Sequence, residues 1–325
     1  MLEESATVGS ALDLMTFKTL IDQRLRDLIN NLKSLSLKPQ LEYVLLSPGK
    51  RLRPIMLLTS TQTVGGETKK AIPLALSIEV LHTATLVHDD IIDQDQNRRG
   101  APTVHKKWSI GDAILLGDAL ISLSIKLASP YGPQIVDTIA ETGLALSNGE
   151  HMELTAPLTT ITEAQYFAEI QGKSAALFRA ATTCGALVGC GNPSEVEALG
   201  EFGERVGLAY QIRDDLDDLK GEDNLISRDL QNGIPTLPII HLYQNGGPQS
   251  RRALEEIFGR RASLSKAHQV MNLLEEKGTI LYCEQRIKEN IEAARNALSI
   301  IKPSEAKNLL LSVFKVINPQ EIGSK

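Results

Sequence analysis

Cysteine is scarce in this chain. The three cysteines among 325 residues, Cys184, Cys190 and Cys283, cannot form a disulfide framework, and none has the paired spacing of a zinc site. The N-terminal segment lacks the basic start and apolar run of a signal peptide, and no uninterrupted apolar run approaches the ~18 residues of a membrane span. We therefore expect a cytoplasmic protein with no membrane span.

Aromatic residues and an excess of positive charge are also missing. Phe, Trp and Tyr make up 4% of the chain, which fits a large β-sandwich or barrel poorly. The 34 Lys and Arg against 40 Asp and Glu give a net charge of −6, whereas a nucleic-acid binder needs a basic face. With 42% apolar and 23% charged residues, the composition predicts a folded globular protein and no nucleic-acid partner.

Helical periodicity is abundant. Apolar residues between 12 and 32 recur near the i, i+3, i+4 spacing of one helical face. Comparable stretches cover 52–64, 71–93, 110–128, 133–154, 163–190, 194–219, 235–244, 251–258, 264–276, 278–300 and 303–317. Gly- and Pro-rich breakers separate them, and alternating strand patterns are scarce. The sequence predicts one all-α domain over residues 1–325, with about ten or more helices.

Two acidic clusters follow apolar helical stretches. Their members are Asp89, Asp90 and Asp93 in the first and Asp214, Asp215 and Asp218 in the second. In each cluster the first and last carboxylates are i and i+4, so they share a helical face and destabilise the helix unless a cation compensates. Carboxylates suit Mg²⁺, which also bridges to substrate phosphates. A solvated acidic helix end is the alternative for either cluster alone, but the repetition favours a metal site.

Basic groups occur in three short runs. They are Gly49-Lys50-Arg51-Leu52-Arg53-Pro54, Arg98-Arg99-Gly100 and Gly172-Lys173-Ser174. Arginine suits bidentate recognition of phosphate oxygens, and lysine acts as a point charge. Each run alone is compatible with a solvated surface. Together with two metal-type clusters, the runs predict a diphosphate site with cations on both sides.

These residues resemble a known family. HTATLVHDDIIDQDQNRRGAPT, residues 82–103, resembles the first aspartate-rich motif of the all-trans polyprenyl diphosphate synthases, and YQIRDDLDD, residues 210–218, resembles the second. The resemblance implies an all-α single-domain bundle around a deep central cavity, usually a homodimer, with the motifs facing each other across its mouth. It implies a prenyltransferase that condenses isopentenyl diphosphate with dimethylallyl, geranyl or farnesyl diphosphate.

The resemblance also implies roles for residues at matching positions. Mg²⁺ would be surrounded by Asp89, Asp90, Asp93, Asp214, Asp215 and Asp218. The allylic diphosphate would contact Arg98, Lys173, Ser174 and Gln211, and isopentenyl diphosphate would bind at Gly49, Lys50, Arg51, His82 and Arg99. Catalysis would rest on Asp89, Asp90, Asp93, Lys173, Asp214 and Asp215. Mg²⁺ and the cations would stabilise charge on the departing pyrophosphate, which is the implied proton acceptor.

The stretch after the second motif departs from the family pattern. Family members carry one Lys in a Gly-Lys pair and another just before Thr-Leu-Pro. Here residues 222–230 contain no such pair, and Ile234 stands where the second Lys is expected. Arg228 is a candidate replacement for the first. These losses leave open a catalytically weak or silent subunit of a heteromeric synthase and, with less support, a class I terpene cyclase.

The helix of the first motif also bears on product length. Its face below the aspartates presents Thr85, Ala84, Leu81 and Ile78. The family's shortest-chain members resemble one another in placing a bulky aromatic residue near Ala84 and Thr85. Because the next bulky side chains lie one and two turns deeper, at ~5.4 Å per turn, we predict products of about twenty to thirty carbons.

Several residues stay undecided at this point. Glu150 and Glu153 lie on an apolar helix, where a place in the site and a salt-bridged or solvated role are equally supported. Phe178 fits a cavity wall or the core equally well. The small residues around Cys184 predict close packing between helices.

Overall fold

The computed structural model describes residues 14–32, 35–220, 227–260 and 263–318, with Lys220 described by its backbone alone. The helices in chain order are α1 (Leu14–Asn31), α2 (Lys38–Leu45), α3 (Leu52–Thr63), α4 (Thr68–Ile92), α5 (Val104–Lys107), α6 (Ile110–Ala128), α7 (Pro133–Thr155), α8 (Glu163–Ile170), α9 (Ala176–Val188), α10 (Pro193–Lys220), α11 (Arg228–Asn232), α12 (Leu237–Asn245), α13 (Gly247–Glu255), α14 (Leu264–Glu276), α15 (Thr279–Ala297), α16 (Glu305–Leu311) and α17 (Phe314–Ile317). Shorter segments are 3-10 helices η1 (Ser129–Tyr131) and η3 (Leu298–Ile300), π-helix η2 (Gln171–Ala175) and the hairpin β1 (Asn97–Arg98) and β2 (Ala101–Pro102). The all-α prediction is confirmed.

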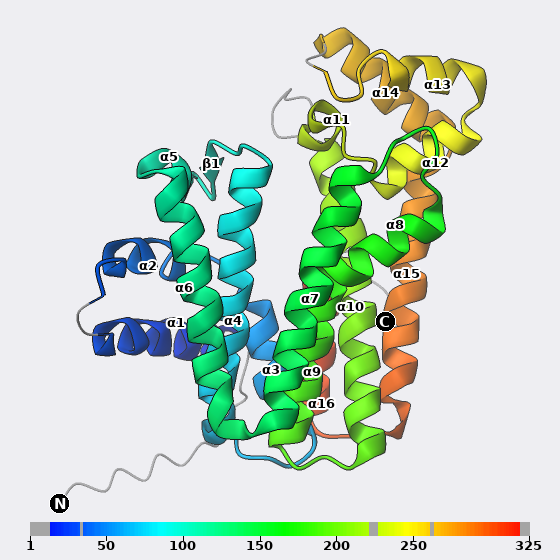
Figure 1. The fold of residues 1–325 in the computed structure, drawn as a ribbon. Helices are drawn as coiled ribbons and strands as arrows, with labels where there is room; N and C mark the ends of the chain where they lie inside the picture. The colour runs from blue at the N-terminus through cyan, green and yellow to red at the C-terminus, as the bar shows by residue number, and fades with distance from the viewer. Residues whose placement is uncertain (1–13, 33–34, 221–226, 261–262, 319–325) are drawn as a thin grey trace, which may run out of the picture.

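The longest helices stand side by side in a bundle (Figure 1). Helix α4 packs on α6, α9 packs on α3 and α10, and α10 also packs on α15. Helices α4 and α10 both run upward in this view, so the acidic motifs at their C-terminal ends come to the same end of the bundle. The fold thereby brings together two motifs that lie far apart in the sequence.

Helix α4 is the central buried helix. It is the one helix in the described parts of the chain that is long and apolar enough to cross a membrane, but 67% of its most apolar window is buried inside the fold. Because α6, α3 and α9 cover it, its apolar surface belongs to the core. Its hydropathy therefore reflects burial within the protein.

Small residues set the distance between α3 and α9. A Cβ atom on Gly185 would lie 2.3 Å from the carbonyl oxygen of Leu57, so the position has no room for a side chain. Thr61 Oγ1 donates a hydrogen bond to the carbonyl oxygen of Gly185 at 2.9 Å. Cys184, next to Gly185 on α9, is fully buried, as its small-residue surroundings predict.

A second close approach positions a lysine. Helix α7 and η2 meet at Gly149 and Gly172, and a Cβ on Gly149 would lie 2.2 Å from the backbone nitrogen of Lys173. The π-helical turn interrupts the regular ladder between α8 and α9, a distortion that often marks functional sites. Lys173 is thus presented to the side chains at the C-terminal end of α7.

Candidate active site

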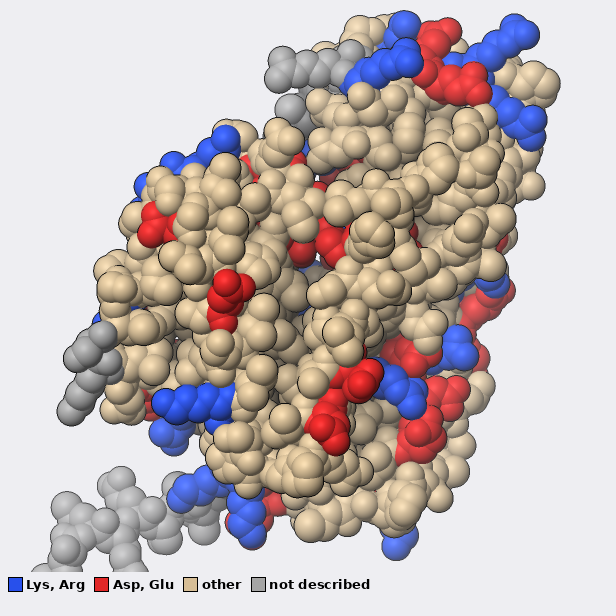
Figure 2. All heavy atoms as spheres, viewed as in Figure 1, with Lys and Arg blue, Asp and Glu red and all other residues tan. Residues whose placement is uncertain are grey.

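The first acidic motif divides between two directions. Asp93 places a carboxylate oxygen within 4.8 Å of oxygens of Glu150 and Glu153 on α7. Asp89 lines the cavity between α4 and α7. Asp90 is buried elsewhere, and its carboxylate accepts a hydrogen bond from Arg98 Nε at 2.5 Å. Figure 2 shows acidic side chains inside the cleft between the two upper parts of the molecule.

Lys173 is the cation at the centre of this acidic region. Its Nζ lies 3.0 Å from Glu150 Oε2, and it also donates to Glu153 Oε1. Burial alone lowers the pKa of Lys173, but the negative charges of Glu153 and Glu150 outweigh burial and raise it. The sequence left both glutamates undecided; the structure places them beside Asp93 and Lys173.

The second acidic motif is held by neighbouring side chains. Asp215 is buried and accepts hydrogen bonds from Tyr166 at 2.6 Å and from Gln211 Nε2 at 2.8 Å. Ser174 donates to Gln211 Oε1, which links two residues predicted to bind the allylic diphosphate. Asp214 is exposed, but the protein around it removes water from its carboxyl group, and this desolvation raises its pKa to about 6. The positive charges of Lys50 and Arg53 oppose the shift.

The third aspartate of the second motif anchors α11. Asp218 Oδ2 accepts hydrogen bonds from Ser227 Oγ at 2.5 Å and from the Asp229 amide at 3.2 Å. Arg228 then lies between the motifs, with Nε 4.0 Å from Asp218 Oδ1 and Nη1 3.7 Å from Asp95 Oδ2. The rest of the divergent stretch, residues 221–226, lies outside the described residues.

A basic pocket of about 390 Å³ adjoins the second motif at Tyr210. It is lined by Pro48, Gly49, Lys50, Arg51, Leu52, Arg53, Glu79, His82, Arg99 and Tyr210. Arg53 Nη1 lies 3.2 Å from His82 Nε2, and its guanidinium carbon is 4.2 Å from the Phe178 ring centroid. Burial and the charge of Arg53 hold the pKa of His82 well below its usual range, so the ring is neutral and accepts this hydrogen bond.

Arg53 is a residue that the sequence reasoning missed. Its Nε is buried and has no hydrogen-bond partner among the described residues, which leaves a donor free in a pocket rich in cations. The available signal was its place in the same basic run as Lys50. Phe178, undecided from sequence, is fully buried beneath Arg53 and Tyr210.

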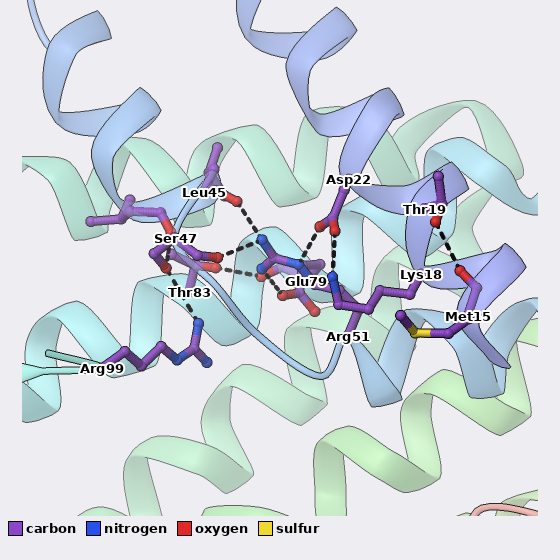
Figure 3. A network of polar contacts seen from close by, with 11 residues as sticks. Met15, Lys18, Thr19, Asp22, Leu45, Ser47, Arg51, Glu79, Thr83 and Arg99 are labelled. Atoms are coloured by element: carbon purple, nitrogen blue, oxygen red, sulfur yellow. Dashed lines mark hydrogen bonds and ion pairs between the residues drawn. The ribbon is translucent and has the colours of Figure 1, made fainter.

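Arg51, in contrast, lies at the centre of a polar network (Figure 3). It donates to Asp22 at 2.9 Å and to Glu79 at 2.6 Å, and to the carbonyl oxygens of Leu45 and Ser47 at 2.8 Å each. Its backbone is left-handed, with φ 51°. This network connects α1, α2, α3 and α4 around the turn that carries Gly49 and Lys50.

The hairpin after α4 separates two neighbouring arginines. Arg99 and Gly100 form its turn with φ of 53° and 79°, which suits a two-residue hairpin loop. Arg98 reaches Asp90, whereas Arg99 Nη1 lies 3.3 Å from Ser47 Oγ at the basic pocket. The two side chains therefore have different partners, Asp90 for Arg98 and Ser47 for Arg99.

An apolar cavity of about 520 Å³ extends from the first motif between α4, α6 and α7. Asp89, Glu150 and Lys173 lie at its polar end. Its wall includes Leu81, Ala84 and Thr85, together with Ile121, Ile125, Ile139 and Leu146. Ile78 is fully buried in the core and does not line this cavity. The volume lies in the range of small-molecule sites.

Known proteins match this chain over most of its length. A family model described as polyprenyl synthetase matches residues 35–275. The chain belongs to the polyprenyl synthetase family. A short chain isoprenyl diphosphate synthase of Methanothermobacter thermautotrophicus is 30% identical over 318 residues, covering 95% of this chain and 98% of the relative. An octaprenyl diphosphate synthase of Escherichia coli is 30% identical, covering 84% and 87%.

Solved structures agree with this assignment. The crystal structure of geranylgeranyl pyrophosphate synthetase from Pyrococcus horikoshii superposes with a TM-score of 0.86 at 32% identity, covering 94% of this chain and 96% of that chain. A decaprenyl diphosphate synthase from Rhodobacter capsulatus gives a TM-score of 0.87 at 27% identity, covering 94% and 98%. The polyprenyl synthetase fold predicted from the sequence is confirmed.

As a polyprenyl synthetase, the protein is a prenyltransferase that elongates isoprenyl diphosphates. Members of the family use isopentenyl and allylic diphosphates and bind the diphosphate through divalent metal. The names of the relatives and of the solved structures extend from short-chain to decaprenyl products, so they do not fix the product length here. They lend no support to the terpene cyclase or the silent subunit.

Proposed function

We propose that this enzyme condenses isopentenyl diphosphate with dimethylallyl, geranyl or farnesyl diphosphate and releases all-trans products of about twenty to thirty carbons. One observation carries the proposal: Asp89, Glu150 and Lys173 lie at the polar end of an apolar cavity, and Asp215 of the second motif is linked through Gln211 to Ser174, next to Lys173. A basic pocket lined in part by Tyr210 of the second motif adds further positive charge. The diphosphate group of the allylic substrate belongs at the polar end, and its hydrocarbon chain belongs in the cavity.

The acidic residues fit Mg²⁺. Asp93, Glu150 and Glu153 offer oxygens within 4.8 Å of one another, and buried Glu150 Oε1 has no hydrogen-bond partner in the described structure. We assign the metal to Asp89 and Asp93 on one side and to Asp214, Asp215 and Asp218 on the other, with Asp90 holding Arg98. When bound, Mg²⁺ stabilises negative charge on the leaving pyrophosphate.

The chain's own residues then share the work on the allylic substrate. Lys173 and Arg98 bind oxygens of its diphosphate, and Ser174 and Gln211 orient it. As the carbon–oxygen bond breaks, these cations oppose the charge that develops on pyrophosphate. The double bond of isopentenyl diphosphate attacks the allylic cation, and pyrophosphate takes up the proton that is lost. The cavity walls exclude water from the cation.

The basic pocket is assigned to isopentenyl diphosphate. Lys50, Arg53 and Arg99 supply positive charge there, and neutral His82 holds Arg53. We infer that Arg51 supports this site through its network, because its guanidinium already donates to two carboxylates and two carbonyl oxygens. Gly49 leaves space for the arginines, since a Cβ there would lie 3.0 Å from Arg99 Nη1.

The proposal is tested by incubating purified protein and Mg²⁺ with radiolabelled isopentenyl diphosphate and each primer in turn. Reversed-phase chromatography measures the product lengths. We expect products of about twenty carbons or more. Products that stop at farnesyl diphosphate contradict the length assignment. No incorporation with any primer contradicts the elongation of these substrates, and the two missing family lysines would then be the first explanation to test.

We further propose a homodimer that acts in the cytoplasm. Helix α6 exposes the apolar side chains of Ile110, Ile114 and Leu115, which do not line the cavity. The surface over this helix is largely uncharged in Figure 2. The three cysteines are free thiols, as suits a reducing compartment. Light scattering is expected to give the dimer mass for the wild type and a lower mass for Leu115→Glu; a monomeric wild type contradicts the dimer.

A further inference from the structure

Lys173 is surrounded by more negative charge than its single ammonium group can neutralise. It forms ion pairs with Glu150 and Glu153, which lie at i and i+3 on α7 and repel each other. Asp93, on the opposite wall, places an oxygen within 4.8 Å of both glutamates. Three carboxylates from two helices therefore converge on one side chain that the reaction also needs for the diphosphate.

Glu150 has an oxygen that Lys173 does not satisfy. Oε2 is paired with Lys173 at 3.0 Å, but Oε1 is buried without a hydrogen-bond partner in the part of the chain that the structure describes. The residue is only 8% exposed. A buried carboxylate oxygen without a partner is unfavourable, and a bound ligand is one established reason for such an atom. The convergence of three carboxylates on this point indicates a cation.

The backbones of α7 and η2 are in direct contact beside these residues. A Cβ on Gly149 would lie 2.2 Å from the backbone nitrogen of Lys173, and one on Gly172 would lie 2.8 Å from the carbonyl oxygen of Ala145. The exchange that follows requires only side chains to move. The long Lys173 side chain is free to change partner by rotation about its own bonds, whereas the glutamates keep their positions on α7.

We propose that Glu150 and Glu153 exchange Lys173 for a divalent cation. In the free enzyme the two glutamates hold Lys173. In the loaded enzyme they bind the cation together with Asp93, and Lys173 turns to the diphosphate. The turn of Lys173 to the diphosphate rests on the proposed function. The competition between Lys173 and a metal for the glutamates does not.

The exchange makes diphosphate and metal binding depend on each other. A diphosphate that withdraws Lys173 leaves three carboxylates without their cation, so metal affinity rises. A metal that arrives first releases Lys173 for the diphosphate. Because coupling between two ligands is reciprocal, each one strengthens the binding of the other by the same factor.

The test is Mn²⁺ binding to the full-length, metal-free protein without any phosphate, followed by electron paramagnetic resonance. Lys173→Met is expected to bind Mn²⁺ about tenfold more tightly than the wild type, because the competing charge is gone. The added change Glu153→Gln is expected to abolish this gain. Lys126→Met, which removes an exposed lysine from α6, is the matched control and is expected to bind like the wild type.

Equal or weaker Mn²⁺ binding by Lys173→Met overturns the exchange. A gain that survives Glu153→Gln overturns the assignment to this cluster. Circular dichroism checks that each variant is folded, and Lys173→Gln replaces Lys173→Met if the latter is unfolded. Primer elongation by the wild type is scored separately, so a failure of the exchange and a failure of the proposed function give different results.

Discussion

Burial opposes ionisation of the carboxyl groups at the mouth of the cavity. It raises the pKa values to about 8 for Asp89, about 6 for Asp93, about 7 for Asp215 and about 9 for Asp229. Neighbouring carboxylates add to the effect, as Glu150 does at Asp89. A divalent cation must therefore compete with protons for these carboxyl groups, because only the ionised form is a metal ligand.

Arg228 is only loosely held by its neighbours near the mouth. Its side chain is 69% exposed, and its two ion pairs are longer than hydrogen bonds. Arg228→Ala is expected to raise the KM for the allylic diphosphate about tenfold and leave the KM for isopentenyl diphosphate unchanged, because a charge-assisted hydrogen bond contributes about 1.5–3 kcal/mol.

Steady-state kinetics with each substrate varied in turn measures this difference. Arg252→Ala, at an exposed position on α13, is the control and should change neither constant. If Arg228→Ala leaves the KM for the allylic substrate unchanged, the arginine does not stand in for the missing lysines.

Ala84 lines the cavity more than one turn before Asp89 on α4. It is fully buried and lines the cavity, whereas Ile78 does not reach it. Ala84→Phe is expected to shorten the product to farnesyl diphosphate or less, at a stability cost of about 1–3 kcal/mol from overpacking. Ile78→Val is the control. Chromatography measures the product length of each variant. An unchanged product length from Ala84→Phe contradicts the placement of the growing hydrocarbon chain in this cavity.

The start of α3 places two arginines in different surroundings. Arg51 sits in a left-handed turn and turns back to Asp22 and buried Glu79, so it holds α1, α3 and α4 together. Arg53 lies on the first turn of α3 and faces the basic pocket. We therefore expect Arg51, whose charge is buried and paired, to stabilise the fold. We expect Arg53, which has a free donor in the pocket, to bind the substrate.

This division predicts opposite results for two matched variants. Arg51→Met leaves Glu79 as an unpaired buried charge and is expected to lower the free energy of unfolding by about 3–5 kcal/mol. Arg53→Met is expected to raise the KM for isopentenyl diphosphate about tenfold with a much smaller loss of stability. Urea unfolding and kinetics measure both. A stable Arg51→Met that fails to bind isopentenyl diphosphate would show direct contact instead.

The stability of the whole molecule depends on the protonation of the buried carboxyl groups at the mouth of the cavity. Glu169 is buried, and burial together with the charge of Glu153 raises its pKa well above the usual range; Asp229 behaves alike, with a pKa of about 9. A carboxyl group with a raised pKa binds its proton more tightly in the folded state than in the unfolded state. Folding stability therefore falls as pH rises from about 4 to 9.

Without metal, the melting temperature in EDTA is expected to fall between pH 6 and pH 9. Each strongly shifted carboxyl group contributes at most about 1.4 kcal/mol per pH unit. Glu169→Gln is expected to flatten the dependence, since the amide does not titrate. Mg²⁺ should restore stability most at the higher pH, where the carboxylates are ionised. A Glu169→Gln profile parallel to that of the wild type contradicts the role of this residue.

Helical periodicity was enough to predict the all-α fold, and the residues of the two acidic motifs were enough to show the resemblance to the family, which implied that the motifs face each other. Both signals are local: the 3.6-residue period puts Asp89 and Asp93 on one face, and apolar stripes need a shared core. Tertiary packing was needed to show that Asp90 turns to Arg98, that Arg53 faces the basic pocket, and that Glu150 and Glu153 join Asp93. A helix position gives the direction of a side chain, but its partner depends on which helix packs opposite.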